Sequence, residues 1–129
     1  GEASRIMLAI KSILAEADQI PVLIFDEIDT GVSGHTAGRV ANKLRQLSSG
    51  RQIFCITHLA QIAAMADQHI LIEKIADQNR TKTCLKLLDP ECRLAELARL
   101  LSGGTDVQAA RNLAGSLLLE AETVRKNPG

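Results

Sequence analysis

The sequence predicts an α/β fold with parallel core strands flanked by helices. Two almost wholly apolar runs of strand length, VLIF at 22–25 and QIFCIT at 52–57, are joined by a segment with helical apolar spacing. Strand–helix–strand units of this kind have parallel strands. The remainder of the chain adds the patterns of a β-hairpin and of two helices. With 129 residues, of which 46% are hydrophobic, we expect one domain over 1–129.

The first expected element is a helix from about 2 to 17, with apolar residues spread over a broad helical face. So broad an apolar face is typical of a helix that is largely buried. Pro21 then prevents helical continuation. The run at 22–25 shows no alternation of apolar and polar residues, so it predicts a parallel strand covered on both faces.

A glycine-containing loop at 31–34 leads into a second helix, 35–47, and Gly50 in the following SSG suits its C-terminal end. Further along, the patterns predict in turn a strand at 52–57, a short helix at 59–67, an antiparallel hairpin of 69–76 and 81–88, and two helices at 91–101 and about 105–126.

Composition excludes several functional classes. Fifteen basic and fifteen acidic residues cancel, so no net field favours nucleic-acid or membrane binding by this segment. No apolar run reaches the roughly 20 residues that span a bilayer, so we expect no membrane contact. Cys55, Cys84 and Cys92 form no CxxC pair, which favours reduced thiols and a cytoplasmic location.

Acidic and polar residues gather where the two predicted strands end. Asp26 and Glu27 follow the first strand, and Thr57 and His58 follow the second. The carboxyl ends of neighbouring parallel strands share one edge of the sheet, which is where open α/β sheets bind ligands. We therefore expect two carboxylates, a hydroxyl and an imidazole in one crevice.

These groups suit phosphoryl chemistry. Mg²⁺ prefers oxygen ligands, and a second carboxylate can activate a water molecule. Because neighbouring strand residues point to opposite sides, Asp26 and Glu27 would take different tasks. The alternative is that the acids form a solvated strand end, with Asp29 or Ser33 capping the next helix and His58 starting a helix. The order of the features along the chain favours the chemical interpretation.

Four segments also resemble known motifs, in the order and spacing of one family. VLIFDE (22–27) resembles a Walker B strand, and DTGVSG (29–34) resembles a D-loop. ITHLAQIAAMAD (56–67) is similar to a switch-histidine segment, and GEASRIMLAIK to the end of a signature motif (1–2) with its following helix. The chain thus resembles the C-terminal lobe of a P-loop NTPase-like ABC ATPase head of the SMC-like class, and within it the bacterial DNA-repair members.

The resemblance implies roles for three residues in ATP hydrolysis. Asp26 would hold Mg²⁺ through water, and Glu27 would be the general base. His58 would contact the γ-phosphate. These members repair and recombine DNA at double-strand breaks through nucleotide-dependent dimerisation of their heads.

Further residues would act across a pair of heads. Asp29, Ser33 and Gly34 would lie in the loop that faces a second head, most simply a second copy. Gly1 and Glu2 would end the signature loop, which touches ATP bound on that head. DNA would be a partner of the full-length protein.

Parts of the family pattern are absent. The chain has no GxxxxGKS or GxxxxGKT phosphate loop and no coiled coil, so we expect its partner to be an N-terminal Walker A lobe outside this sequence. Alone, the chain is expected to be inactive and to bind ATP and Mg²⁺ weakly. LSGGT at 101–105 matches the signature by letters but follows the histidine segment, so we interpret it as a turn between helices, with Gly103 or Gly104 ending one and Thr105 or Asp106 capping the next.

Two alternatives remain open from sequence. The first is a self-contained metal-dependent phosphoesterase or nuclease that uses Asp26, Glu27, Asp29 and His58. The second is a non-catalytic dimerisation lobe in which the acids are structural.

Overall fold

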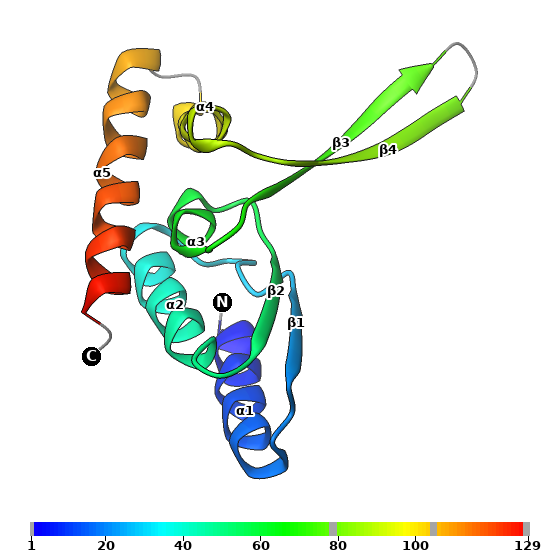
Figure 1. The fold of residues 1–129 in the computed structure, drawn as a ribbon, viewed down its shortest axis with the longest axis vertical. Helices are drawn as coiled ribbons and strands as arrows, with labels where there is room; N and C mark the ends of the chain where they lie inside the picture. Colours follow the sequence, from blue (N-terminus) through cyan, green and yellow to red (C-terminus); the bar gives the residue numbers. More distant parts are fainter. Residues whose placement is uncertain (1, 78–79, 104–105, 128–129) are drawn as a thin grey trace.

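The computed structural model describes residues 2–77, 80–103 and 106–127. Helices and strands alternate through the first half, and a hairpin and two helices follow (Figure 1). This order is the predicted one. The elements are α1 (Glu2–Asp18), β1 (Val22–Asp26), α2 (Gly34–Leu47), β2 (Gln52–Ile56), α3 (Ala60–Met65), β3 (Ile70–Asp77), β4 (Arg80–Leu87), α4 (Pro90–Ser102) and α5 (Val107–Lys126).

The strands β1 and β2 pair in parallel, as predicted, with α2 as the crossover between them. The register runs from Val22 opposite Gln52 to Asp26 opposite Ile56. The two carboxyl ends therefore lie side by side at one edge of the sheet.

The helix α2 packs because its apolar residues recur every three or four positions. It begins after Ser33, whose backbone is extended, and Gly50 follows its end with φ +80°. Glycine adopts that left-handed conformation without steric cost. The side chains that α2 buries are Ala37, Val40, Ala41, Leu44 and Leu47.

The β1–β2 sheet is covered on one face only, which corrects the prediction for the run at 22–25. Leu23 and Phe25 are buried in a core with α2, whereas Val22 and Ile24 are 46% and 60% exposed. An unbroken apolar run indicates that both faces can be buried, but it does not indicate which chain segment supplies the cover. Among the described residues, helices cover only the face that carries Leu23 and Phe25.

The helix α1 is also less buried than predicted. Leu8 and Ser12 are buried, but four other large apolar side chains are 45–68% exposed. Lys11 attaches α1 to the sheet, since its Nζ donates to the Ile24 carbonyl oxygen at 3.1 Å and lies 5.2 Å from the centre of the Phe25 ring. The exposed side chains are Ile6, Met7, Ile10 and Ile13.

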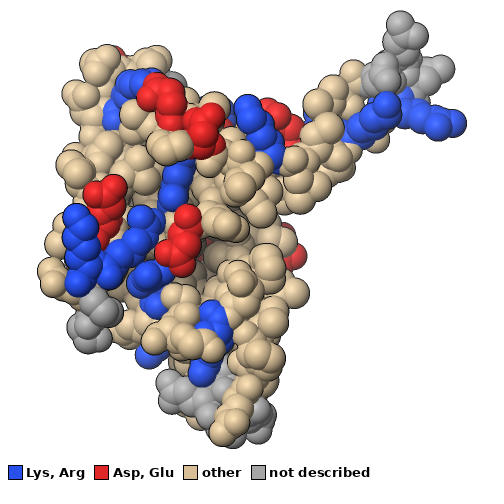
Figure 2. Space-filling model, viewed as in Figure 1, with Lys and Arg blue, Asp and Glu red and all other residues tan. Residues whose placement is uncertain are grey.

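The strands β3 and β4 form the predicted antiparallel hairpin, which projects away from the helices (Figure 1). Ile70 pairs with Leu87 at its base. Every side chain of β4 is exposed. In the space-filling view the hairpin stands clear of the body, and Lys and Arg side chains lie near its end (Figure 2).

A second core lies between α3, α4 and α5, and it is rich in alanine around the fully buried Leu97. Asp89 caps the start of α4 by accepting from the Cys92 amide at 2.8 Å. Gly103, at φ +36°, ends α4, and Asp106 caps α5 by accepting from the Gln108 amide at 2.9 Å. Within LSGGT, Leu101 and Ser102 are the last residues of α4 and Gly103 ends it, as predicted, while residues 104 and 105 lie outside the described part.

No helix in the described ranges has the length and apolar character needed to cross a membrane.

Candidate functional site at the ends of the parallel strands

The loops after β1 and β2 meet at the carboxyl edge of the sheet, as the sequence predicts. Asp29 joins them, because its carboxylate accepts hydrogen bonds from residues that follow β2. Its Oδ2 lies 2.5 Å from the Thr57 hydroxyl, 2.9 Å from the His58 amide nitrogen and 3.1 Å from His58 Nδ1. One carboxylate thus fixes both the backbone and the ring of the predicted switch histidine.

The burial of Asp29 makes this contact strong. The residue is only 3% exposed, and a buried carboxylate needs partners to remain charged. Burial alone would raise the pKa of Asp29, but hydrogen bonds from the Thr57 hydroxyl and the His58 amide, with the charge of the imidazole, hold that pKa below its ordinary value. Asp29 is therefore ionised at neutral pH and can orient the imidazole.

Thr57 connects this carboxylate to α3. Its hydroxyl donates to Asp29 and accepts from the Leu59 amide at 3.0 Å. Leu59 in turn is the residue that precedes α3. The position of α3 and the position of the His58 ring are thereby linked through three residues.

The side chain of His58 remains accessible despite its contact with Asp29, since it is 74% exposed. With Nδ1 directed at the carboxylate, Nε2 is the ring nitrogen left for a ligand. The geometry therefore presents an oriented imidazole at the edge of the sheet.

Asp26 and Glu27 are both exposed, but their backbones differ. Asp26 is the last residue of β1 and shares the open face with Val22 and Ile24. Glu27 lies beyond the strand with φ +56°. The argument that strand alternation separates the two side chains is therefore wrong, because the turn, rather than the strand, sets the direction of Glu27.

The left-handed backbone of Glu27 is a local strain. It costs a residue other than glycine about 1–2 kcal/mol. The turn is closed by Thr30, whose amide and hydroxyl donate to the Glu27 carbonyl oxygen at 3.4 and 3.1 Å. Strain of this kind is concentrated at functional sites.

The residues expected to face a second head lie at exposed positions, apart from Asp29. Ser33 precedes α2, and its hydroxyl makes no capping hydrogen bond. Gly34 opens α2 at φ +38°. Neither Asp29 nor Ser33 therefore caps α2 through its side chain. Glu2 is exposed in the first turn of α1, while Gly1 lies outside the described residues.

The structure brings together Asp29, Thr57 and His58 but offers no ready metal cage. No group of three or more His, Cys, Asp or Glu side chains suited to a metal lies within the described residues. Asp26 fits Mg²⁺ as a single carboxylate ligand, which is how this ion binds when a nucleotide and water supply the remaining oxygens. The self-contained phosphoesterase has no support from this arrangement.

Cys55 lies below the site in β2. Burial, and then the charges of Asp29 and Asp26, raise the pKa of its thiol to about 12. The thiol therefore stays protonated at neutral pH, and the side chain packs against the hydrophobic core.

Comparison with solved structures identifies the fold. The chain aligns with an SMC ATPase, reported in work on ATP-driven dimerization and DNA-stimulated activation of SMC ATPases, with a TM-score of 0.61. The alignment covers 78% of this chain and 60% of that chain at 24% identity. At this identity the likeness shows the fold alone. The fold is that of a P-loop NTPase-like lobe of the SMC ATPase type.

Sequence comparison gives a closer relationship. The chain is 44% identical over 125 residues to the DNA repair protein RecN of Bacillus subtilis, covering 97% of this chain and 22% of the relative. RecN of Treponema pallidum is 43% identical over 129 residues, and that of Rickettsia conorii 46% over 118 residues, covering 100% and 92% of this chain. No family model matches.

The chain is thus RecN-like along its whole length, which confirms the resemblance predicted from its motifs. It spans only 22% of the length of these relatives.

The sequence places Thr57 and Asp29 near the site but does not indicate that they contact each other. The contact that joins them crosses 28 positions, from Asp29 to Thr57. Only the predicted pairing of the two strands pointed to that proximity.

Proposed function

We propose that this chain is the C-terminal lobe of the ATPase head of a RecN-like protein that repairs and recombines DNA at double-strand breaks in the bacterial cytoplasm, at the nucleoid. ATP binding and hydrolysis would act by pairing two such heads. One observation carries the proposal: Asp29 holds the His58 ring at the edge of the sheet where Asp26 ends β1 and Glu27 follows it. The RecN relatives, which are DNA repair proteins, support it.

The rest of the head would cover the open face of the sheet. Val22 and Ile24 on β1 and Phe54 and Ile56 on β2 are 46–60% exposed there. Asp26 lies on the same face, at its carboxyl edge. A Walker A lobe from the same protein, placed on this face, would bury the apolar side chains and bring the nucleotide phosphates to Asp26.

Each residue of the site would then have one task. Asp26 would hold Mg²⁺ through water, and the ion, when bound, would neutralise charge on the phosphates. Glu27 would accept the proton of the attacking water, since its exposed carboxylate extends beyond the strand. His58 would donate from Nε2 to a γ-phosphate oxygen.

The contact with Asp29 supports this task for His58. Asp29 occupies Nδ1 and so leaves Nε2 of the oriented ring to face the phosphate. Asp29 would thus act within its own head, and only the exposed Ser33 and Gly34 would face the second head, opposite Gly1 and Glu2 of its signature loop.

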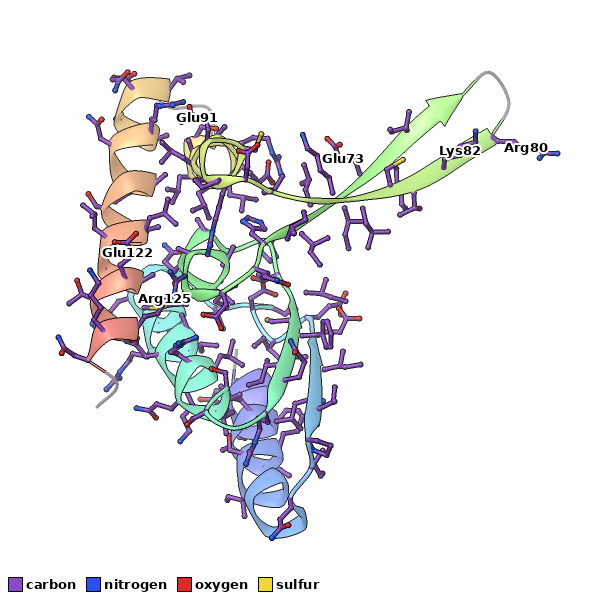
Figure 3. All side chains as sticks on the ribbon, viewed as in Figure 1. Glu73, Arg80, Lys82, Glu91, Glu122 and Arg125 are labelled. Atoms are coloured by element: carbon purple, nitrogen blue, oxygen red, sulfur yellow. The ribbon has the colours of Figure 1, made fainter. Side chains whose placement is uncertain are left out.

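The test is Mg²⁺-dependent ATP turnover, compared between this chain and the full-length protein. We expect activity only in the full-length protein. There Glu27→Gln should lower turnover by about 10²–10⁴-fold, because the general base is lost. Glu122→Gln, on the exposed surface of α5 (Figure 3), is the matched control and should leave it unchanged.

Turnover by the 129-residue chain alone would contradict the split site. Unchanged turnover in Glu27→Gln would contradict the role of Glu27.

A further inference from the structure

The helix α3 lies between the two cores of the molecule. Ile62 and Met65 pack into the core of the β1–β2 sheet, and Ala60, Ala63 and Ala64 pack into the core with α4 and α5. The helix begins two residues after His58. Any displacement of α3 is therefore passed directly to the imidazole.

Packing alone defines the axial position of α3 poorly. A helix of six residues is too short to be stable by itself. The side that faces α4 and α5 is made of alanines, whose short side chains interlock less deeply than larger ones. Directional contacts at its two ends must therefore set where it lies.

At its C-terminal end, two arginines from other helices bind the last carbonyl groups. Arg93, on α4, places Nη2 3.1 Å from the carbonyl oxygen of Ala63 and 2.9 Å from that of Ala64. The same nitrogen lies 2.6 Å from the Ala66 carbonyl oxygen, to which Arg125 on α5 donates at 2.8 Å. Helix ends leave such carbonyls unsatisfied, and cations there also interact favourably with the helix dipole.

Arg125 lies on the part of α5 nearest α3 (Figure 3). Asp67, just beyond α3, balances the charges: it lies 3.6 Å from Arg125 Nε, and both its oxygens lie 2.8 Å from Arg45 Nη1 on α2. Burial, and then the neighbouring charge of Arg125, lower the pKa of Arg93. The two positively charged guanidinium groups therefore lie close together, and their hydrogen bonds to the carbonyl groups of α3 offset the repulsion between them.

We propose that Arg93 and Arg125 are positioning residues for His58. They attach the end of α3 to α4 and α5, while Thr57 and Asp29 hold its start. The two C-terminal helices thereby set where the imidazole lies relative to the nucleotide. This inference rests on the proposed role of His58 in ATP hydrolysis.

The experiment uses the full-length protein and measures kcat and KM for ATP. Arg93→Met and Arg125→Met should each lower kcat by about 10- to 100-fold, because small displacements of a catalytic group have effects of this size. KM should stay unchanged, since neither residue binds ATP. Arg93→Lys should restore part of kcat, because it keeps a cation at the end of the helix.

The control is Arg99→Met. Arg99 lies on the same helix, α4, but binds Glu96 of that helix at 2.6 and 2.7 Å instead of α3. It should retain full kcat. Thermal midpoints of all variants should be compared, and if Arg93→Met does not fold, Arg93→Lys and Arg125→Met serve in its place.

A double-mutant cycle separates positioning from general stability. In a His58→Ala background, Arg93→Met should cause little further loss, because both changes remove the same function. If the two losses multiply in full, or if Arg93→Met and Arg125→Met keep full kcat, the positioning role is wrong while the proposed function stands. If His58→Ala itself leaves turnover unchanged, the proposed role of His58 fails, and the inference fails with it.

Discussion

The two sides of the segment from β1 to the following turn differ in what surrounds them. On the inner side, Leu23, Phe25 and Asp29 are buried, and Oδ2 of Asp29 accepts from the Thr57 hydroxyl and the His58 amide. On the outer side, Ile24, Asp26 and Glu27 are exposed. Of three acids within four positions, one is a structural anchor and two remain available for chemistry. Burial rather than residue type distinguishes them.

The largest difference in stability should appear between alanine substitutions on the buried and the exposed side of β1. Phe25→Ala removes a fully buried ring and should destabilise the chain by about 3–5 kcal/mol. Ile24→Ala, one position earlier on the 60% exposed side, should change the free energy of unfolding by less than about 0.5 kcal/mol. Urea unfolding of the 129-residue chain measures both, and equal losses would show that the open face is covered in solution.

Removing the charge of the inner acid should have the next largest effect. Asp29→Asn should cost about 1–3 kcal/mol at neutral pH, because it leaves buried donors poorly paired. The pKa of Asp29 is lower in the folded chain, so its contribution is present above the unfolded pKa of about 3.9 and is lost as pH falls through the folded pKa.

The stability difference between wild type and Asp29→Asn should therefore shrink in acid below about pH 4. A difference that is constant from pH 7 to pH 3 would contradict this account of Asp29. Asp26→Asn, on the exposed side, is the matched control.

Substitution of the exposed acid Glu27 should stabilise the chain, whereas substitution of Asp29 destabilises it. Glu27→Gly removes the strain of the left-handed backbone at φ +56°. Glycine also costs conformational entropy on folding, so the net stabilisation should be about 0.5–1 kcal/mol. The same change should abolish ATP turnover in the full-length protein. The gain in stability would follow from relief of the backbone strain, and the loss of turnover from removal of the carboxylate. A destabilised Glu27→Gly variant would show that the side chain has a structural role.

The smallest effect should come from the hairpin. Ile72→Thr, at a position 54% exposed and opposite Leu85, should change stability of the chain by less than about 0.5 kcal/mol. Urea unfolding again provides the measurement. A larger loss would mean that the hairpin packs against another surface in solution.

Local patterns predicted most of the fold. Apolar periodicity gave the element order, and the two strand runs gave the parallel pairing that brings His58 to the acids. The turn at Gly103 and Asp106 followed from capping chemistry. These features depend on neighbours in sequence, which a single sequence displays.

The remaining features depend on tertiary contacts. One face of the sheet is open in the described structure, and an apolar run does not specify which segments cover it. The contact of Asp29 with Thr57 joins separate loops, and the left-handed backbone of Glu27 is forced by the turn. Arg93 and Arg125 have the sequence pattern of solvated helix positions, because no local signal indicates that both bind α3.

The alternation along β1 has a consequence for changes of chain length. Each residue of the strand occupies the opposite face from its neighbour, so Phe25 and Asp26 are oriented by the same two-residue period. A deletion of one residue within β1 would turn the carboxylate toward the core and the aromatic ring toward solvent. Side chains along this strand can therefore be substituted one at a time. An insertion or deletion of one residue instead changes the direction of the site carboxylate and of the core side chains at once.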